Sequence, residues 1–154
     1  NITSFFNSQD IHFLANQYFK VIQKSGLEFD AMYGPAYKGI PLATAIGQLF
    51  YIEEKKKIEL IFDRKEIKDH GEGGKLIGNI SGKRILIIDD VLTAGTAIKE
   101  TVEIIQHNNA KAVAAIVALD RMEKDSNSLT FKENLEKNLS IPILSITTFQ
   151  DLKK

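Results

Sequence analysis

The sequence predicts one α/β domain with a mainly parallel central sheet flanked by helices. Strand-like and helical segments alternate along the chain, as in proteins built from β-α-β units. The apolar run at residues 85–88 has no polar alternation, which is typical of a strand buried on both faces. The length of 154 residues suits a single domain spanning residues 1–154. Ligands of such sheets bind at the carboxyl ends of the strands, where we expect the functional site.

The amino-terminal part of the chain predicts a helix, a strand and a second helix. Ser8 is a suitable N-cap for the first helix, whose apolar residues recur at helical spacing until Gly26 ends it. Residues 28–33 form a short, partly apolar segment that runs into a Gly-Pro turn, as a strand does. Pro41 suits the first turn of the second helix.

The rest of the chain continues this alternation. We expect strands at residues 59–62, 84–89, 112–119 and 143–146, helices at 96–107 and 129–135, and a short turn at the carboxyl terminus. Between the first two of these strands, residues 63–78 are rich in charge and glycine and predict a mobile loop.

Composition excludes several classes of function. Hydrophobic residues make up 44% of the chain, yet no segment approaches the ~20 apolar residues of a membrane span. Twenty basic and twenty acidic residues give a formal net charge of zero, so we expect no nucleic-acid partner. The chain has no cysteine, which is compatible with the cytoplasmic location that we expect. Three dispersed histidines argue against a transition-metal site.

Two acidic residues and a small-residue loop follow the predicted strand at residues 84–89. Asp89 and Asp90, the acid pair, precede the loop of residues 93–96, which reads Thr-Ala-Gly-Thr. The backbone N–H groups of that loop and the helix start behind it can bind a phosphate dianion, since small residues allow a close approach. The acid pair can accept hydrogen bonds from sugar hydroxyls or hold Mg²⁺ through water. A phosphorylated sugar fits this pattern; the alternative is an ordinary turn in which Thr96 only caps the helix.

Basic residues supply further candidate contacts to phosphate. Residues 64–70 contain Arg64, Lys65, Lys68 and His70, and the glycines that follow can act as a hinge. Such a loop could close over a polyphosphate and neutralise a departing pyrophosphate. Taken alone, the segment is more typical of a solvated surface loop, and only its combination with the small-residue loop favours phosphate binding.

Three more residues are candidates on weaker grounds. Tyr37 and Lys38 lie in a Gly-Pro-rich turn before a helix, which gives a second phosphate-facing turn. Arg121 follows an apolar strand and can present a planar fork to a carboxylate, although an arginine at a strand end is more often a surface residue.

These segments together resemble a known enzyme family. The run Ile-Leu-Ile-Ile-Asp-Asp-Val-Leu-Thr-Ala-Gly-Thr-Ala at residues 85–97 is similar to the phosphoribosyl diphosphate (PRPP) binding motif of type I phosphoribosyltransferases. Residues 62–74 resemble the flexible-loop signature of the orotate phosphoribosyltransferase family, and residues 33–43 resemble its pyrophosphate loop. Asp120-Arg121-x-Glu123 fits the same family. The resemblance implies a type I phosphoribosyltransferase fold with a flexible loop over the active site.

The resemblance also implies an activity and its residues. The reaction would transfer the phosphoribosyl group of PRPP to orotate, giving orotidine 5′-phosphate and pyrophosphate in pyrimidine (UMP) biosynthesis. The implied catalytic residues are Lys68, Asp89 and Asp90, and the implied orotate contacts are Thr93 and Arg121. The implied PRPP contacts are Tyr37, Lys38, Arg64, Lys65, Lys68, His70, Asp89, Asp90, Val91, Leu92, Thr93, Ala94, Gly95, Thr96 and Ala97. The cofactor would be Mg²⁺, held mainly through PRPP and water near Asp89 and Asp90, and the enzyme a homodimer with shared active sites.

The sequence departs from the family pattern at its start. Family members carry, ahead of the position that matches Asn1, a strand and loop with a lysine for PRPP and a Phe-Phe pair that touches orotate. Phe5 and Phe6 lie too near the first helix to match that pair. Two explanations stay open: the sequence is a trimmed version of a longer enzyme, or this form has lost part of its orotate-binding hood.

Two other functions also stay open. A phosphoribosyltransferase for another base would share residues 89–97 but would not need residues 64–74 in this form. A PRPP-binding regulatory protein would keep the phosphate site and perform no chemistry. The neutral charge and the lack of a helix-turn-helix pattern argue against a regulator that binds nucleic acid.

Overall fold

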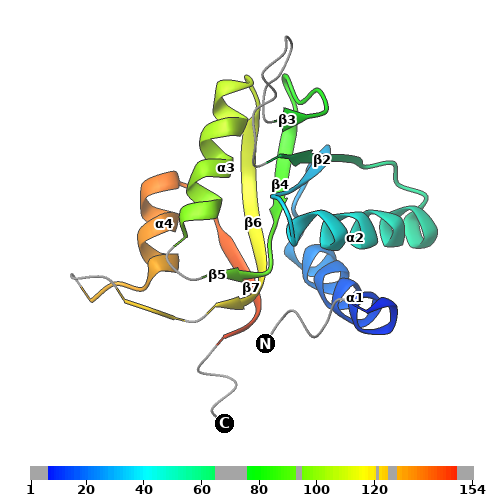
Figure 1. Ribbon diagram of the computed structural model, residues 1–154, viewed down its shortest axis with the longest axis horizontal. Coiled ribbons are helices and arrows are strands. Elements are labelled where there is room, and N and C mark those ends of the chain that lie inside the picture. Colours follow the sequence, from blue (N-terminus) through cyan, green and yellow to red (C-terminus); the bar gives the residue numbers. More distant parts are fainter. Residues whose placement is uncertain (1–6, 65–75, 93–94, 121, 125–127, 149–154) are drawn as a thin grey trace.

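A mainly parallel sheet lies between two groups of helices in the computed structural model of the chain (Figure 1). The structure describes residues 7–64, 76–92, 95–120, 122–124 and 128–148. The helices are α1 (Ser8–Ser25), α2 (Gly39–Glu54), α3 (Thr96–His107) and α4 (Phe131–Leu139). The strands are β1 (Ala31–Gly34), β2 (Glu59–Asp63), β3 (Leu76–Ile77), β4 (Arg84–Ile88), β5 (Val91–Leu92), β6 (Lys111–Asp120) and β7 (Ile143–Thr148). The predicted α/β class is confirmed.

The strands pair in the order β3-β2-β1-β4-β6, and β5 and β7 both pair with β6. All of these pairs are parallel except β2 with β3. Strand β5 continues the line of β4, because Ile88 pairs with Ile116 and Val91 pairs with Leu119. The acid pair therefore falls in a short break between two segments that keep one register against β6.

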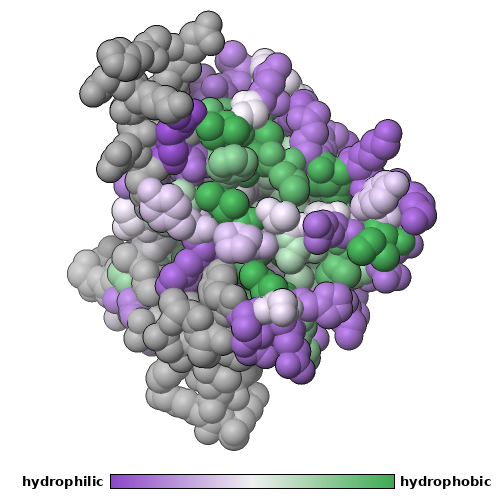
Figure 2. All heavy atoms as spheres, turned by 45° about the vertical axis from the view of Figure 1, so that its right-hand side comes forward, coloured by the Kyte–Doolittle hydropathy of each residue, from purple (hydrophilic) through white to green (hydrophobic). Residues whose placement is uncertain are grey.

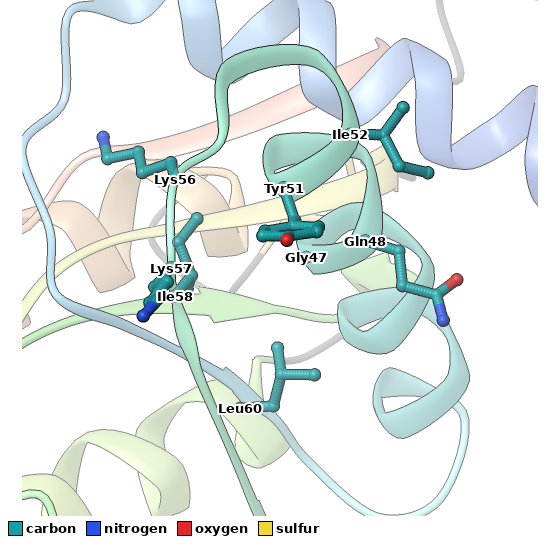
Figure 3. A pocket seen from close by; sticks show the side chains of 8 residues that line it. All are labelled: Gly47, Gln48, Tyr51, Ile52, Lys56, Lys57, Ile58 and Leu60. Carbon is teal, nitrogen blue, oxygen red and sulfur yellow. The ribbon is translucent and has the colours of Figure 1, made fainter.

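Helix α2 presents apolar side chains to solvent on its outer face. Figure 2 shows apolar side chains gathered on this side of the molecule. A cavity of about 550 Å³ lies there, lined by Gly47, Gln48, Tyr51, Ile52, Lys56, Lys57, Ile58 and Leu60, which we call the α2–β2 surface. Figure 3 shows Tyr51 of α2 and Leu60 of β2 facing the same hollow. Tyr51, Ile52 and Leu60 are 54%, 60% and 38% exposed, which is unusual for large apolar residues.

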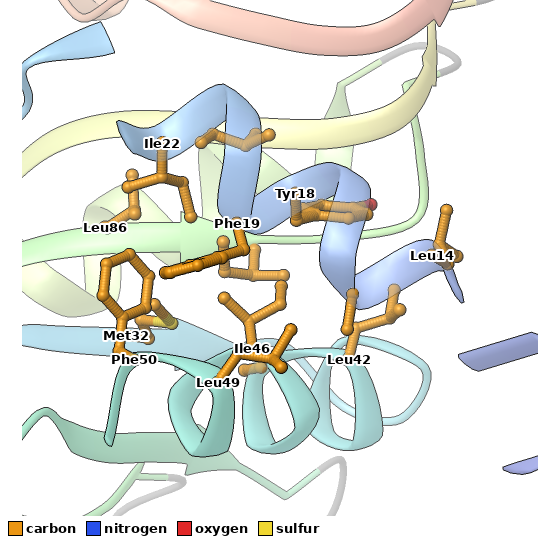
Figure 4. Close-up of a cluster of buried hydrophobic side chains, with 14 of the residues drawn as sticks. Leu14, Tyr18, Phe19, Ile22, Met32, Leu42, Ile46, Leu49, Phe50 and Leu86 are labelled. Atoms are coloured by element: carbon orange, nitrogen blue, oxygen red, sulfur yellow. The ribbon is translucent and has the colours of Figure 1, made fainter. Parts of the chain in front are cut away.

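The inner faces of the helices build two cores, one on each side of the sheet. Alternate residues of a strand point to opposite faces, so Leu86 packs against α1 and α2 while Ile87 packs on the side of α3. In the α1–α2 core, shown in Figure 4, Phe19 and Phe50 meet edge to face with ring centroids 4.7 Å apart. Two cores on one sheet explain why residues 85–88 are apolar without interruption.

The structure corrects several details of the predicted elements. The N-cap of α1 is Asn7, whose side chain accepts the Asp10 N–H at 2.8 Å, and Ser8 is the first helical residue. Helix α4 begins at residue 131, two residues later than predicted, because Thr130 and Glu133 form a capping box before it. Strands β3 and β5 were not predicted; each has two residues.

Other expectations fall partly or wholly outside the described residues. The turn expected at the carboxyl terminus lies outside them, as do residues 65–75 of the expected long loop. Of the helices that the structure describes, none is long and apolar enough to cross a membrane.

An ion-pair cluster joins the amino-terminal ends of β1 and β4. The Arg84 guanidinium donates to Asp30 Oδ1 at 3.0 Å and to Glu28 Oε2 at 3.2 Å. The Arg84 backbone N–H also donates to Asp30 Oδ2 at 2.8 Å. The side-chain and backbone hydrogen bonds from Arg84 lower the pKa of Asp30 from 3.8 to about 2. Asp30 thus favours the folded state only when it is ionised.

We predict a pH-dependent loss of stability on replacing Asp30 by Asn. Because the pKa of Asp30 is lower in the folded chain, its contribution is present above about pH 4 and is lost as the pH falls toward about 2. The difference in thermal unfolding midpoint between wild type and Asp30→Asn should therefore shrink over that range. Glu28→Gln is the matched control, with a smaller effect because Glu28 is mostly exposed. A difference that stayed constant on acidification would contradict the assignment.

Candidate active site

The carboxyl ends of the parallel strands bring most of the predicted ligand-binding segments to one edge of the sheet (Figure 1). Strands β2, β1, β4 and β6 are consecutive neighbours. The turn with Lys38 follows β1, Arg64 follows β2, and the acid pair follows β4. Segments far apart in the sequence thus converge because the strands that precede them are paired.

The acid pair is held by backbone hydrogen bonds to β6. The Asp89 N–H donates to the Ile116 carbonyl at 3.0 Å, and the Asp90 carbonyl accepts the Ala118 N–H at 2.7 Å. Each carboxylate also accepts the N–H of the next residue, Asp89 that of Asp90 at 2.9 Å and Asp90 that of Val91 at 2.8 Å. Asp89 is buried and Asp90 is half-buried. Both carboxylates therefore have defined directions before any ligand arrives.

Lys38 connects the β1–α2 turn to the acid pair. Its Nζ lies 3.8 Å from Asp90 Oδ2, and about half of the Lys38 side chain is exposed. Gly39, the first residue of α2, packs so tightly on β4 that a Cβ there would lie 2.7 Å from the Ile88 carbonyl oxygen. The neighbouring Tyr37 is exposed. The turn thus presents one cation and one aromatic ring beside two carboxylates.

Asp63 and Arg64 complete this side of the site. Asp63 Oδ1 accepts the Ala36 N–H at 2.7 Å, which joins the end of β2 to the turn after β1. Burial and the nearby Asp63 carboxylate raise the pKa of Tyr33. The Arg64 Nε is buried and finds no hydrogen-bond acceptor among the described residues. Asp63 therefore fixes the turn that carries Lys38. Arg64 retains an Nε–H donor that no described residue accepts.

The described part of the small-residue loop consists of its last two residues. Gly95 is buried, has a φ of 79° and is the N-cap of α3, so Thr96 is the first helical residue and not the cap. A Cβ at Gly95 would overlap the Leu135 side chain. Thr96 and Ala97 are exposed at the helix start, beside a cavity of about 440 Å³ lined by Gly95, Thr96, Lys99, Glu100, Glu103 and Leu135. The requirement for a glycine here has two causes, backbone conformation and space.

The other predicted site residues divide into two groups. Val91 and Leu92 form β5, and the buried Leu92 side chain packs in the core, so it could offer a ligand only its backbone. The predicted residues that lie outside the described part of the chain are Lys65, Lys68, His70, Thr93, Ala94 and Arg121.

The site fits a metal ion only in part. Within the described ranges, no three histidine or carboxylate side chains gather closely enough to hold a metal ion. Mg²⁺ typically takes one or two protein carboxylates and completes its shell with water and substrate phosphates. The acid pair meets that requirement. The two carboxylates suit a Mg²⁺ ion whose remaining ligands are water and the phosphate oxygens of a bound substrate.

Sequence reasoning missed residues that act on the site from a distance. Asp63 was counted only as a loop charge; its place at a strand end next to β1 is the signal that could have identified it. Asp120, which the sequence indicated only as part of a family motif, is buried at the end of β6, and its Oδ1 accepts the Met122 N–H at 2.8 Å. Tyr18 donates to the Asp89 carbonyl from α1. No local pattern identifies Tyr18, since its partner is 71 residues away.

We predict that Gly34→Ala disrupts the turn before Lys38. A Cβ at Gly34 would lie 2.6 Å from the backbone carbonyl carbon of Gly39, and backbone atoms cannot rotate away. The expected loss is about 3 kcal/mol in the free energy of unfolding, at the upper end for overpacking, measured by denaturant titration. Gly26→Ala is the control: its Cβ would meet nothing within 4 Å, and its φ of 70° alone should cost about 1–2 kcal/mol. Equal losses would exclude the steric explanation.

Comparison with known proteins assigns the chain to a family. The model of the phosphoribosyl transferase domain matches residues 2–142. Orotate phosphoribosyltransferase of Escherichia coli O139:H28 (strain E24377A / ETEC) is 40% identical over 152 residues, which cover 99% of this chain and 71% of the relative. The enzyme of that name from Pasteurella multocida (strain Pm70) is 44% identical over 153 residues, with the same coverage. A crystal structure of orotate phosphoribosyltransferase from Francisella tularensis, 33% identical, superposes with a TM-score of 0.86 over 99% of this chain and 73% of that one. The chain therefore belongs to the orotate phosphoribosyltransferase family.

Proposed function

We propose that this chain transfers the phosphoribosyl group of PRPP to orotate, which yields orotidine 5′-phosphate and pyrophosphate. The observation that carries the proposal is the meeting, at one sheet edge, of the acid pair, the Lys38 cation and the glycine-started helix α3. That combination suits a ligand with hydroxyls between two phosphate groups. The membership of the chain in the orotate phosphoribosyltransferase family supports orotate as the acceptor.

In this proposal each group of site residues binds a different part of PRPP or the orotate acceptor. The loop of residues 93–96 and the start of α3 bind the 5′-phosphate through backbone N–H groups. Asp89 and Asp90 accept hydrogen bonds from the ribose hydroxyls. The diphosphate contacts come from the residues with cationic or polar donors, namely Tyr37, Lys38, Arg64, Lys65, Lys68 and His70. Thr93 and Arg121 contact orotate.

The proposed chemistry requires positioning and charge stabilisation more than covalent catalysis. C1 of the ribose gains oxocarbenium character as the bond to pyrophosphate breaks, and a ring nitrogen of orotate forms the new bond to C1. The cations around the diphosphate stabilise the negative charge that develops on the leaving group. Holding orotate against C1 removes the entropic cost of bringing two reactants together. Lys68 is the side chain that we expect to influence the rate most.

Mg²⁺ belongs to the same proposal. Asp90, which is half-buried, and Asp89 would hold it through water while PRPP supplies further oxygen ligands. When bound, the ion would neutralise charge on the diphosphate and so favour its departure.

A homodimer with shared active sites is also proposed, with the α2–β2 surface as the interface between two copies. Its exposed apolar residues are Tyr51, Ile52 and Leu60, and Lys56 and Lys57 line the same cavity. A two-fold axis through this surface would set the apolar patch of one copy against the same patch of the other. Strand β3 pairs only with residues 62 and 63 of β2, which leaves the outer edge of residues 59–61 without a strand partner in the described chain. Because β2 leads directly to Arg64, a partner on this surface would lie near the end of β2 that carries a candidate site residue.

Two further expectations complete the proposal. Residues 1–154 form one domain, since both described cores lie on one sheet. The protein acts in the cytoplasm, which agrees with the absence of cysteine from its sequence.

We predict PRPP- and Mg²⁺-dependent loss of orotate, followed by its ultraviolet absorbance, with little or no turnover of uracil, adenine or hypoxanthine. Lys68→Ala should lower kcat by about 10²-fold and change PRPP affinity far less, because leaving-group stabilisation acts in the transition state. Lys20→Ala, an exposed lysine on α1, is the matched control and should leave both values unchanged.

Each other outcome of this experiment identifies a different function. Turnover of a purine or of uracil in place of orotate would make the chain a phosphoribosyltransferase for another base. Saturable PRPP binding without turnover of any base would contradict the enzyme assignment and favour a PRPP-binding regulator. Equal losses of binding and rate in Lys68→Ala would make Lys68 a ground-state contact.

We predict that Ile52→Glu weakens self-association, because it would bury a charge at the centre of the proposed interface. The expected loss is at least about 2 kcal/mol, or roughly thirtyfold in the dimer dissociation constant, measured by analytical ultracentrifugation. Phe13→Glu is the control, since Phe13 is 59% exposed on α1 and does not line the α2–β2 surface. A wild-type monomer, or dissociation by Phe13→Glu and not by Ile52→Glu, would contradict the proposed interface.

A further inference from the structure

Tyr18 links helix α1 to the acid pair across the core. Its side chain is fully buried, with 0% exposure, and packs in the apolar cluster of α1 and α2 (Figure 4). Its hydroxyl donates a hydrogen bond of 2.5 Å to the backbone carbonyl of Asp89. A tyrosine used only as a core residue could be phenylalanine, so the hydroxyl needs a separate explanation.

We propose that Tyr18 is a positioning residue, which fixes the backbone of Asp89 so that the acid pair faces the ribose of PRPP. The inference rests on the proposed function, because it assigns the acid pair to the ribose hydroxyls. Tyr18 itself touches no substrate in this proposal. It acts through Asp89.

The acid pair needs such support because it lies outside regular strand structure. Residues 89 and 90 fall between β4 and β5, and β6 holds them through the Asp89 N–H and the Asp90 carbonyl. The Tyr18 hydroxyl holds the carbonyl of Asp89, from a different element. The direction of each carboxylate follows from the backbone, since Asp89 and Asp90 accept the N–H groups of residues 90 and 91. A shift of the Asp89 peptide would therefore redirect both carboxylates.

The chemistry of a phenol suits this role. Burial raises the pKa of Tyr18, and the neighbouring charges of Asp89 and Asp90 raise it further. The ordinary pKa of a phenol, about 10, already keeps the proton on the hydroxyl at neutral pH, and the structure shows it donated to the Asp89 carbonyl. A lysine or arginine in this place would also donate, but its charge would offset the negative charge that the acid pair needs to bind hydroxyls and Mg²⁺.

The test is Tyr18→Phe, which keeps the ring and removes the hydroxyl. We expect KM for PRPP to rise about three- to tenfold, with KM for orotate within about twofold of wild type and kcat changed less than KM for PRPP. Ile22→Val is the matched control: Ile22 lies one turn further along α1 in the same core, and its side chain is purely apolar. Because Ile22→Val changes only an apolar side chain, it should lower the thermal midpoint and leave both KM values unchanged, which separates positioning from a general loss of stability.

A double-mutant cycle with Asp90→Asn gives a second measurement that does not depend on the size of the single effect. If Tyr18 acts through the acid pair, Tyr18→Phe should raise KM for PRPP much less when Asp90 is already Asn. Fully additive effects would overturn the inference. So would a Tyr18→Phe enzyme that has wild-type KM for PRPP and a lower kcat in proportion to a smaller folded fraction.

The same measurements separate failure of the inference from failure of the proposed function. A wild-type enzyme with orotate turnover and a Tyr18→Phe variant with unchanged KM for PRPP would overturn the role of Tyr18 alone. A wild-type protein that neither consumes orotate nor binds PRPP would overturn the proposed function, and the role of Tyr18 with it.

Discussion

The pairing of the β4–β5 line with β6 is the constraint on which the site depends. The segment from Ile88 to Val91 follows β6 through an interruption of two residues and then resumes the same register. Because register is kept on both sides, the two intervening residues cannot slide, and their side chains emerge at a defined place on the sheet edge. The β1–α2 turn packs on the end of β4 through Gly39, and α3 begins shortly after β5, so both are positioned by this line of strands.

Close backbone packing fixes the position of the β1–α2 turn, as hydrogen bonds to β6 fix the backbone of the acid pair. Gly34 and Gly39 leave no room for a side chain, so the turn lies directly on the end of β4. The hydrogen bond from Ala36 to Asp63 holds the turn from the other side. Lys38 is therefore carried by a rigid support although its own side chain is long and half-exposed. A rigid backbone support of this kind keeps the base of a long side chain at a fixed position beside the acid pair.

The sequence was sufficient for the α/β class and for most of its elements, and it placed the acid pair directly after a buried strand. Long apolar runs such as residues 85–88 and helix-start chemistry such as Pro41 each gave a correct local prediction because short-range physics determines them. What could not be predicted depends on pairing in space. Two-residue strands exist only because a neighbour supplies the hydrogen bonds, and the contact of Tyr18 with Asp89 spans 71 residues. The Asn7 cap was missed because two adjacent residues were both suitable caps.

The strand order has a consequence for how the protein reaches its native state. Strand β1 pairs with β4 although the two are separated by a long stretch of chain, as the 54-residue separation of Asp30 and Arg84 illustrates. Parallel pairings of this kind require large loops to close, with a loss of chain entropy, before the stabilising contacts between the strands can form. Folding is therefore expected to be slow relative to helical proteins of the same size. The sheet edge that carries the candidate site draws on β1, β2, β4 and β6 together, so it cannot assemble in a partly synthesised chain. The nascent protein therefore has no working site until β6 has been made and docked.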